Sequence, residues 1–517
     1  MKRALEYTVK PVFKVLDDTA STYPDRIGFI EPEKGEYTYG EIKSLSDLLA
    51  ARLLKDGLRK GDRVLVFLPN SIEFVVAYYG IQKAGGVVVP LNTLHTDREL
   101  QKYIPVVEPA GVIAMSDFSE ERESLGRLGG FKYMVPAGSD SFLKTLGEQS
   151  RTGVCLPRIN VFEDLAVIPF SSGTTGVPKG VALTHSNLCC NIQQIIDAHE
   201  LFPEDVFINH LPFFHIYGMN VLLGSPVFMG ARQVILSGFE PEILIEGIES
   251  YGATVLFTVP AVLNHLVKQA DLSSRNLKSL RFLNIGGGAL TPEIGAAFTS
   301  ATGVTVNQAY GLTESSPTTH ANPLARIKHD SIGLAIADTF AKIVDPRTLE
   351  EADPGETGEL WIKGPQIMKG YYRNPEASRQ TLVDGWLRTG DIARMDGEGY
   401  TFIVDRLKEL IKYKSYQVPP TELENLLMEM AEVVDCAVVG KPDEEAGELP
   451  VAFVAPRDRS VTEEHIKEYV AAHVAPYKKI RQVIFVDAIP RAASGKLLRR
   501  SLKSRIERTC PPKTPLR

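Results

Sequence analysis

From about residue 40 to residue 330, short apolar runs alternate with stretches of helical periodicity, and this alternation constrains the fold more than any other feature. One unit shows it clearly: RVLVFLP at 63–69, a helical pattern at 71–85 between a serine and a glycine, and a second apolar run at 87–92. Strands that alternate with helices are typical of parallel sheets covered by helices. The sequence therefore predicts doubly wound α/β layers.

The pattern changes after about residue 335. Strand-like runs separated by Gly, Pro and Asp turns predict a small β subdomain; they lie at 340–345, 358–364 and 400–405. Beyond residue 405 the order is mixed, with helical patterns at 420–430 and 462–474 and strand patterns at 433–440 and 449–456. This last part predicts a separate small α+β domain.

The composition narrows the class of protein. A chain of 517 residues is too long for one hydrophobic core, so roughly two to four domains are expected. A net charge of −7 argues against a general nucleic-acid binder. The start, MKRALEYTVK, lacks the apolar run of a signal peptide, and no apolar stretch is long enough to span a bilayer. Five cysteines without a C-x-x-C pair indicate reduced thiols, a cytoplasmic setting and no zinc site.

One loop has the residue types of a phosphate site. SSGTTGVPKG at 171–180 combines glycines, hydroxyls and one lysine without an acid. Glycines let backbone N–H groups turn inward, and hydroxyl and ammonium groups can bind phosphate oxygens. The spacing does not match the Walker A loop, and the apolar flanks at 165–170 and 180–185 look like strands. The loop therefore joins two strands, and an ordinary flexible hairpin is the alternative.

Five further stretches combine reactive side chains with tight turns. They are LPFFHIYGM at 211–219, NIGGGAL at 284–290, QAYGLTESS at 308–316, GWLRTGD at 385–391 and IPRAASGKLLRR at 489–500. Each alone is more often structural than functional; a lone histidine on an apolar face, for example, is usually part of the core. Their order together with the glycine-rich loop is not expected by chance.

In this combination the chain resembles the acyl-adenylate-forming enzymes, which include acyl-CoA synthetases, aryl-acid CoA ligases, beetle luciferases and peptide-synthetase adenylation domains. The resemblance runs from roughly residue 25 to 502. It implies a large N-terminal domain at 1–404, a hinge at 405–409 and a small mobile C-terminal domain at 410–517. It also implies ATP and Mg²⁺, which activate a carboxylate as acyl-AMP with release of pyrophosphate, and transfer of the acyl group to a thiol.

The phosphate loop and the adenine site are expected to hold the nucleotide. Thr174, Thr175 and Lys179 have the chemistry to hold the β- and γ-phosphates. By resemblance, Tyr310 stacks on adenine and the turn from Gly287 to Ala289 lines its other face. The nucleotide-binding residues expected in these stretches are Ser171, Ser172, Gly173, Thr174, Thr175, Gly176, Lys179, Gly287, Gly288, Ala289, Gln308, Ala309, Tyr310, Gly311 and Leu312.

The resemblance also implies the catalytic assignments. Thr313 contacts the α-phosphate, Glu314 binds Mg²⁺, and Asp391, helped by Arg406, accepts the ribose hydroxyls. Lys496 bridges the α-phosphate and the attacking carboxylate, and His215 lies beside that carboxylate. The C-terminal domain turns near Lys408, after which Lys412 and Gln417 replace Lys496 at the active site.

The acid is expected to be apolar. Amino-acid activators of this family carry an aspartate near the position of Phe214 and His215, so a substrate without an α-amino group is favoured. The acyl pocket is expected between 215–220, 285–288 and 308–311. These features predict an acyl-CoA synthetase for a fatty or aryl acid, acting as a monomer or homodimer with at most peripheral membrane contact.

Three alternatives remain open. Ser415 replaces a glycine that the family usually has beside its pantetheine tunnel, so the first alternative is an acyl-AMP ligase that loads an acyl carrier protein instead of CoA. The second is a luciferase-like oxygenase, and the third is a silent nucleotide-binding module.

Overall fold

The computed structural model describes residues 4–115, 131–137, 142, 143, 146, 155–171, 178–269, 271–288, 290, 292–407, 409–413, 416–443, 446–458, 461–491 and 497–509. It divides into two compact units. The first contains Met1–Ala341 and Ile362–Leu387, and the second contains Lys342–Trp361 and Arg388–Arg517. Among the described residues no helix is both long and apolar enough to cross a membrane.

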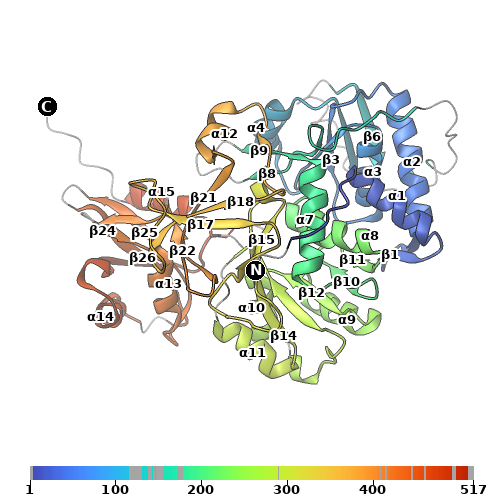
Figure 1. The fold of residues 1–517 in the computed structure, drawn as a ribbon. Coiled ribbons are helices and arrows are strands. Elements are labelled where there is room, and N and C mark those ends of the chain that lie inside the picture. Colours follow the sequence, from blue (N-terminus) through green and yellow to red (C-terminus); the bar gives the residue numbers. More distant parts are fainter. Residues whose placement is uncertain are drawn as a thin grey trace. The chain divides into compact units, whose positions relative to one another are not determined.

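The first unit contains an eight-stranded sheet (Figure 1). Its order is β19 (Gly370–Tyr371), β9 (Lys179–Thr184), β7 (Leu165–Val167), β4 (Val87–Pro90), β3 (Arg63–Phe67), β5 (Gly111–Met115) and β6 (Tyr133–Ala137), with β8 (Phe170–Ser171) paired to β9. The strands from β7 to β6 are parallel, as predicted. The pairs that involve β9 are antiparallel; the short connections from β7 and β8 to β9 leave no room for a crossover helix.

A nine-stranded sheet forms the other half of this unit. Its order is β16 (Leu334–Ala335), β15 (Thr318–Ala321), β14 (Thr305–Gly311), β13 (Phe282–Ile285), β12 (Val255–Thr258), β10 (Val206–Asn209), β11 (Arg232–Ile235), β1 (Ile27–Glu31) and β2 (Gly35–Thr38). The six strands from β14 to β1 are parallel. Their carboxyl ends therefore meet at one edge, where open α/β sheets bind their ligands.

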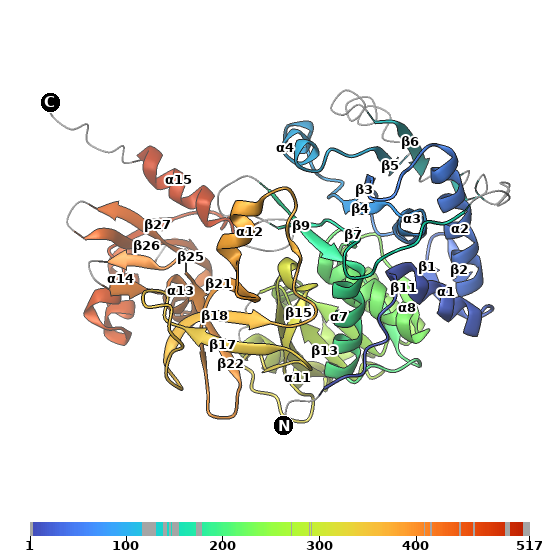
Figure 2. The ribbon, with the colours of Figure 1, turned by 45° about the horizontal axis from the view of Figure 1, so that its top comes forward.

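Helices fill three layers around the two sheets. The central core between the sheets takes side chains from α1 (Val12–Thr22), α2 (Tyr39–Lys55), α3 (Ile72–Lys83), α7 (His185–Ala198), η1 (Tyr217–Gly224) and α8 (Ser225–Met229) (Figure 1). The outer face of the nine-stranded sheet packs on α9 (Pro241–Tyr251), α10 (Pro260–Gln269), η2 (Leu272–Ser274) and α11 (Pro292–Thr302). The outer face of the eight-stranded sheet packs on α4 (Asp97–Val107) (Figure 2). A short helix, α12 (Pro375–Thr381), and β20 (Leu382–Val383) complete the unit.

The local sequence explains how these layers form. Along β3, Val64 and Val66 face the central core while Leu65 and Phe67 face α4, the alternation expected of a strand buried on both sides. Helix α3 begins after Ser71, whose side chain accepts a hydrogen bond from the backbone N–H of Phe74. The predicted strand–helix–strand unit at 63–92 is therefore confirmed.

The second unit contains strands of two five-stranded sheets. The first sheet has β17 (Phe340–Val344), β18 (Thr357–Lys363), β21 (Trp386–Met395) and β22 (Thr401–Arg406), and β20 pairs with the first two residues of β21. The other has β24 (Tyr416–Val418), β23 (Ile411–Tyr413), β26 (Gly447–Pro456), β25 (Val433–Asp443) and β27 (Gln482–Phe485). Its helices are α13 (Pro420–Met428), α14 (Glu463–His473), η4 (Pro476–Lys478) and α15 (Arg499–Thr509). The strands and helices predicted beyond residue 335 are confirmed.

Buried polar contacts connect the start of α13 with strand β22. The carboxylate of Asp405 accepts hydrogen bonds from the backbone N–H groups of Thr421, at 2.9 Å, and Arg406, at 2.7 Å. Burial raises the pKa of this carboxyl to about 6. In the same unit, Arg499 at the start of α15 donates to Glu409 and Glu424.

Candidate functional site

The glycine-rich loop joins two paired strands, as predicted. Strands β8 and β9 are antiparallel, with Phe170 opposite Gly180 and Ser171 opposite Lys179. The two described ends of the loop are therefore fixed side by side. The loop residues between them, namely Ser172, Gly173, Thr174, Thr175 and Gly176, lie outside the described residues.

Predicted site residues from three strands gather at the carboxyl edge of the nine-stranded sheet. His215 follows β10, Gly287 and Gly288 follow β13, and the stretch 308–312 forms the end of β14 and the turn after it. Ile285 pairs with Gln308 across β13 and β14, which brings the glycine turn next to Tyr310. Ala289 lies outside the described residues.

Backbone geometry requires glycine at two of these positions. Gly287 has a φ of 76°, a conformation that glycine adopts without strain. A Cβ atom at Gly311 would lie 2.0 Å from the carbonyl oxygen of Pro317. Gly287 is therefore needed for its positive φ, and Gly311, directly after Tyr310, is needed because the backbone there leaves no room for a side chain.

Glu314 is the candidate Mg²⁺ ligand. It lies in η3 (Thr313–Ser315), directly after β14, and both Thr313 and Glu314 are half-buried. Among the described residues no three His, Cys, Asp or Glu side chains group together as a metal site. Mg²⁺ is commonly bound through one or two carboxylates together with substrate phosphates, so a single carboxylate beside a phosphate loop fits this ion.

Tyr371 is a site residue that the sequence analysis missed. Its hydroxyl donates a 2.8 Å hydrogen bond to Oε1 of Glu314. The ammonium of Lys179 lies 4.8 Å from the centre of its ring. Burial, and then the charge of Glu314, raise the pKa of the Tyr371 hydroxyl, so it stays protonated and can donate. Its only sequence signal is a tyrosine after a glycine in GYYRNP, a pattern typical of many turns.

The imidazole of His215 keeps some exposed surface but has protein packed around its other sides. Its pKa falls to about 4 because this surrounding protein removes part of the hydration that the charged form needs, and His95 adds a like charge. The ring is therefore neutral at neutral pH. A neutral imidazole can lie beside a carboxylate and an adenylate without pairing permanently with either.

Tyr217 lies within the stretch 215–220 that is predicted to line the acyl pocket. It begins η1, an eight-residue π-helix, and its hydroxyl lies 3.4 Å from the carbonyl oxygen of Thr258 and from Oδ1 of Asn284. A Cβ atom at Gly286 would lie 3.0 Å from its ring. Because Gly286 has no side chain, the Tyr217 ring can pack closely against its backbone. π-Helical turns are rare and frequently occur at functional sites.

In the second unit, the two predicted ribose residues form a pair. Asp391 on β21 is opposite Arg406 on β22, and the guanidinium Nε lies 3.1 Å from the Asp391 carboxylate. The Asp391 side chain is only 4% exposed, whereas that of Arg406 is 41% exposed. Arg406 therefore orients the nearly buried carboxylate of Asp391. A fixed orientation of this kind suits a carboxylate that accepts hydrogen bonds from two hydroxyls.

The two residues predicted for the second reaction step occupy opposite positions on paired strands. Lys412 pairs with Gln417 across β23 and β24, and the Lys412 side chain is exposed. The backbone N–H of Lys412 donates to Glu448, which fixes the strand. Lys408, Ser415 and Lys496 lie outside the described residues.

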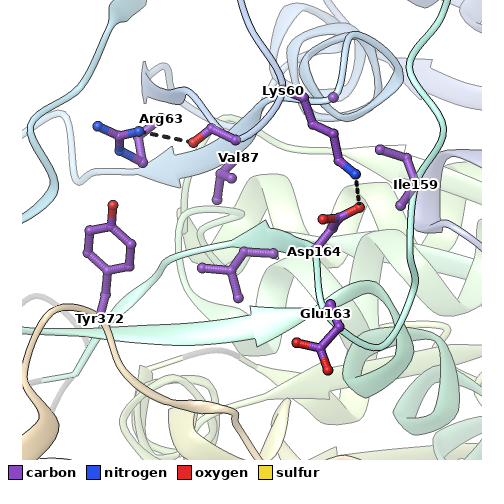
Figure 3. Close-up of a pocket in the computed structure, with 10 residues that line it drawn as sticks. Lys60, Arg63, Val87, Ile159, Glu163, Asp164 and Tyr372 are labelled. Atoms are coloured by element: carbon purple, nitrogen blue, oxygen red, sulfur yellow. Dashed lines mark hydrogen bonds and ion pairs between the residues drawn. The ribbon is translucent and has the colours of Figure 1, made fainter.

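Figure 3 shows a different cavity, at the amino ends of β3, β4 and β7 in the first unit. Lys60 points toward Asp164 there, and the two side chains form a 2.6 Å ion pair. The cavity holds about 140 Å³, well below the roughly 300 Å³ at which small-molecule sites begin. None of the predicted site residues lines it, so it is not the candidate functional site.

Comparison with known proteins reveals extensive similarity. A curated rice protein, "4-coumarate--CoA ligase 5" (Oryza sativa subsp. japonica), is 36% identical over 94% of this chain and 93% of its own length. "4-coumarate--CoA ligase-like 9" from Arabidopsis thaliana is 39% identical over 90% of this chain and 84% of its own.

Solved structures agree with this similarity. ATP-bound MatB from Rhodopseudomonas palustris has a TM-score of 0.90 and 28% identity, over 96% of this chain and 99% of that one. The anthranilate CoA ligase AuaEII, in complex with anthranoyl-AMP, has a TM-score of 0.88 and 26% identity, over 97% of this chain and 98% of that one. Residues 16–372 match the AMP-binding enzyme model and residues 422–496 match the model of the AMP-binding enzyme C-terminal domain. With both models matched in chain order, the chain belongs to the AMP-binding enzyme family.

Proposed function

We propose that the protein is an ATP-dependent acyl-CoA ligase that activates an apolar carboxylic acid, fatty or aryl, without an α-amino group. The observation that carries this proposal is that His215, the Gly287 turn and Tyr310 lie at or after the carboxyl ends of parallel strands of one sheet, with Glu314 directly after the last of these strands. These groups offer a surface for adenine, a carboxylate for Mg²⁺ and a neutral imidazole at the same edge of the nine-stranded sheet.

The first half-reaction joins two anions, so the site must reduce their repulsion. Lys179 and the loop hydroxyls bind the β- and γ-phosphates, and Thr313 binds the α-phosphate. Lys496 holds the carboxylate against the α-phosphorus while pyrophosphate leaves. Glu314 would hold Mg²⁺, which would supply positive charge to the phosphates. Asp391 and Arg406 fix the ribose.

The second half-reaction transfers the acyl group to a thiol. The thiolate attacks the acyl carbonyl carbon, and AMP leaves with the bonding electrons. Lys412 and Gln417, paired on the β23–β24 hairpin, face the acyl-AMP in this step, after the C-terminal domain has turned at Lys408. CoA is the favoured thiol because the curated relatives named above are CoA ligases or ligase-like proteins.

The test measures pyrophosphate release over a panel of fatty, cinnamic and benzoic acids, followed by thioester formation. Each active acid is offered CoA or a phosphopantetheinylated carrier protein. We expect pyrophosphate release with apolar acids and thioester formation with CoA. Activity with α-amino acids alone would contradict the substrate class. Thioester formation only with the carrier protein would favour the acyl-AMP ligase and indicate that Ser415, in place of the family's usual glycine, excludes CoA. Oxygen uptake would favour the luciferase-like oxygenase.

A further inference from the structure

Tyr371 lies between the two opposite charges that the proposed site uses. Its hydroxyl donates to Oε1 of Glu314 at 2.8 Å, and its ring is 4.8 Å from the ammonium of Lys179. Within the described part of the chain, Lys179 has no carboxylate within ion-pair distance. The tyrosine therefore contacts both the candidate metal ligand and the candidate phosphate ligand.

The backbone around Tyr371 is fixed to both of these elements. Strand β19 pairs with β9, where Tyr371 is opposite Val181. The backbone N–H of Met368 donates to the carbonyl of Glu314 at 2.9 Å. The backbone N–H of Tyr371 donates to the hydroxyl of Ser378 at 2.8 Å. Tyr371 thus has little freedom to leave its place between the β8–β9 hairpin and η3.

This placement solves a problem of electrostatics. A lysine and a glutamate that both point at a triphosphate attract each other. If they formed a direct ion pair, the lysine would no longer be available to the phosphates and the glutamate would no longer be available to the cation. A phenol hydroxyl takes one lone pair of Oε1 and leaves Oε2 free for a cation. The ring face attracts the ammonium by a cation–π interaction but leaves its three protons free to donate.

We propose that Tyr371 is a positioning residue that orients the Glu314 carboxylate for the metal–nucleotide complex and keeps Lys179 apart from it. This inference rests on the proposed function, because it assigns Glu314 to Mg²⁺. Tyr371 is assigned no contact with the reacting carboxylate or the phosphorus; it acts through Glu314 and Lys179. A partner that orients a metal ligand typically changes metal affinity by about 10- to 100-fold when it is removed.

The first experiment is Tyr371→Phe, which removes the hydroxyl but keeps the ring. The readout is binding of Mn²⁺ in the presence of a non-hydrolysable ATP analogue, measured by electron paramagnetic resonance without turnover. We expect the half-saturating Mn²⁺ concentration to rise by about tenfold. The KM for the acid should stay unchanged. The matched control is Tyr372→Phe, which removes a hydroxyl at the neighbouring position, lining the cavity of Figure 3, and should leave Mn²⁺ binding unaltered.

Two further variants separate the hydroxyl from the ring. Tyr371→Leu removes both, so it should weaken binding of the nucleotide more than Tyr371→Phe does. In a Glu314→Gln background, Tyr371→Phe should add little, because residues that act through one contact are not additive. Circular dichroism and thermal unfolding midpoints confirm that each variant is folded.

The outcomes are distinguishable from those of the proposed function. Unchanged Mn²⁺ binding in folded Tyr371→Phe overturns the inference, as does an equal loss in the Glu314→Gln background. If the wild-type protein binds Mn²⁺ with the analogue, responds to Tyr371→Phe and yet activates no acid, the inference stands and the proposed function fails. Failure of the wild-type protein to bind Mn²⁺ with the analogue overturns the inference.

Discussion

At the scale of single residues, Lys496 is the side chain on which we expect adenylation to depend most. In the proposed mechanism its ammonium stabilises charge that peaks as the carboxylate attacks the α-phosphorus. Lys496→Ala should therefore slow acyl-AMP formation by about 10²–10³-fold, as removal of other preorganised donors does. Thioester formation from supplied acyl-AMP should stay largely intact, because that step uses Lys412. Separate assays of the two half-reactions check this; equal losses in both, or normal pyrophosphate release, contradict the role.

Gly286 is the residue that we expect to limit the length of the acid. A leucine at position 286 would extend into the space beside the Tyr217 ring. Its Cβ atom would lie 3.0 Å from that ring. Gly286→Leu should lower kcat/KM for the longer of two active acids by about 10- to 200-fold, the usual effect of a few methylene-sized contacts. Steady-state kinetics with both acids measures the ratio. Tyr217→Ala in the same chain should recover part of the loss, and an unchanged preference would exclude this wall.

At the scale of elements, the sequence predicts most of the site because its chemistry lies in local motifs. The strands that flank the loop at 171–180 were predictable from their apolar runs, and the carboxyl edge that carries His215, Gly287 and Tyr310 follows from parallel strands. The resemblance to adenylate-forming enzymes is confirmed by the two family matches. The roles assigned to individual residues stay predictions.

Two features were not predictable because they depend on distant contacts. Tyr371 meets Glu314 only after β19 pairs with β9, and these elements are about 190 residues apart in the chain. The π-helix at Tyr217–Gly224 has the composition of an ordinary apolar helix. Its register is stabilised by Asn220, whose side chain donates to the carbonyl of Ser316 at 2.6 Å. Single-sequence patterns do not encode such pairings.

The end of β14 leaves no room for added volume at Gly311. In Gly311→Ala the new methyl group must displace the backbone at Pro317, since it would lie 2.0 Å from that carbonyl oxygen. Overpacking of this kind costs about 1–3 kcal/mol. We expect a lower thermal midpoint and a raised KM for ATP, because Tyr310 moves with the strand. Gly238→Ala is the control, since nothing lies within 4 Å of its Cβ position; equal midpoints for the two variants would contradict the prediction.

At the scale of the whole molecule, the chain passes between the two units along β17, β18 and β21. The predicted hinge at 405–409 falls within the second unit, which also contains the strands that carry Asp391 and Arg406. The predicted boundaries at 404 and 410 stay a prediction. The predicted boundaries mark the position of the proposed hinge, whereas the two units are defined by how compactly the chain is packed.

Lys408→Pro tests the turn itself. Proline fixes φ near −65°, so rotation at this position should be hindered. We expect thioester formation from supplied acyl-AMP to fall by about tenfold or more while pyrophosphate release survives. Rapid-quench measurement of each half-reaction, with circular dichroism as the folding check, gives the result. An equal fall in both rates would move the pivot elsewhere in the chain.

The hydrogen bond between Asp405 and Thr421 spans the predicted hinge, so we expect the equilibrium between the two proposed poses to be proton-linked. Asp405 precedes Lys408 and Thr421 follows it, so a turn at Lys408 should break the bond and expose the carboxyl to water. Its pKa is about 6 in the present pose and would fall toward the ordinary value of about 3.9 on exposure. The present pose therefore binds the proton more tightly than the turned pose. This proton binding stabilises the present pose relative to the turned one fully below about pH 4, and the stabilisation is lost as pH rises through 6. The ratio of the two half-reaction rates should change across this window in the wild type and stay flat in Asp405→Asn, and an identical pH profile in both would show that the carboxyl does not titrate with the turn.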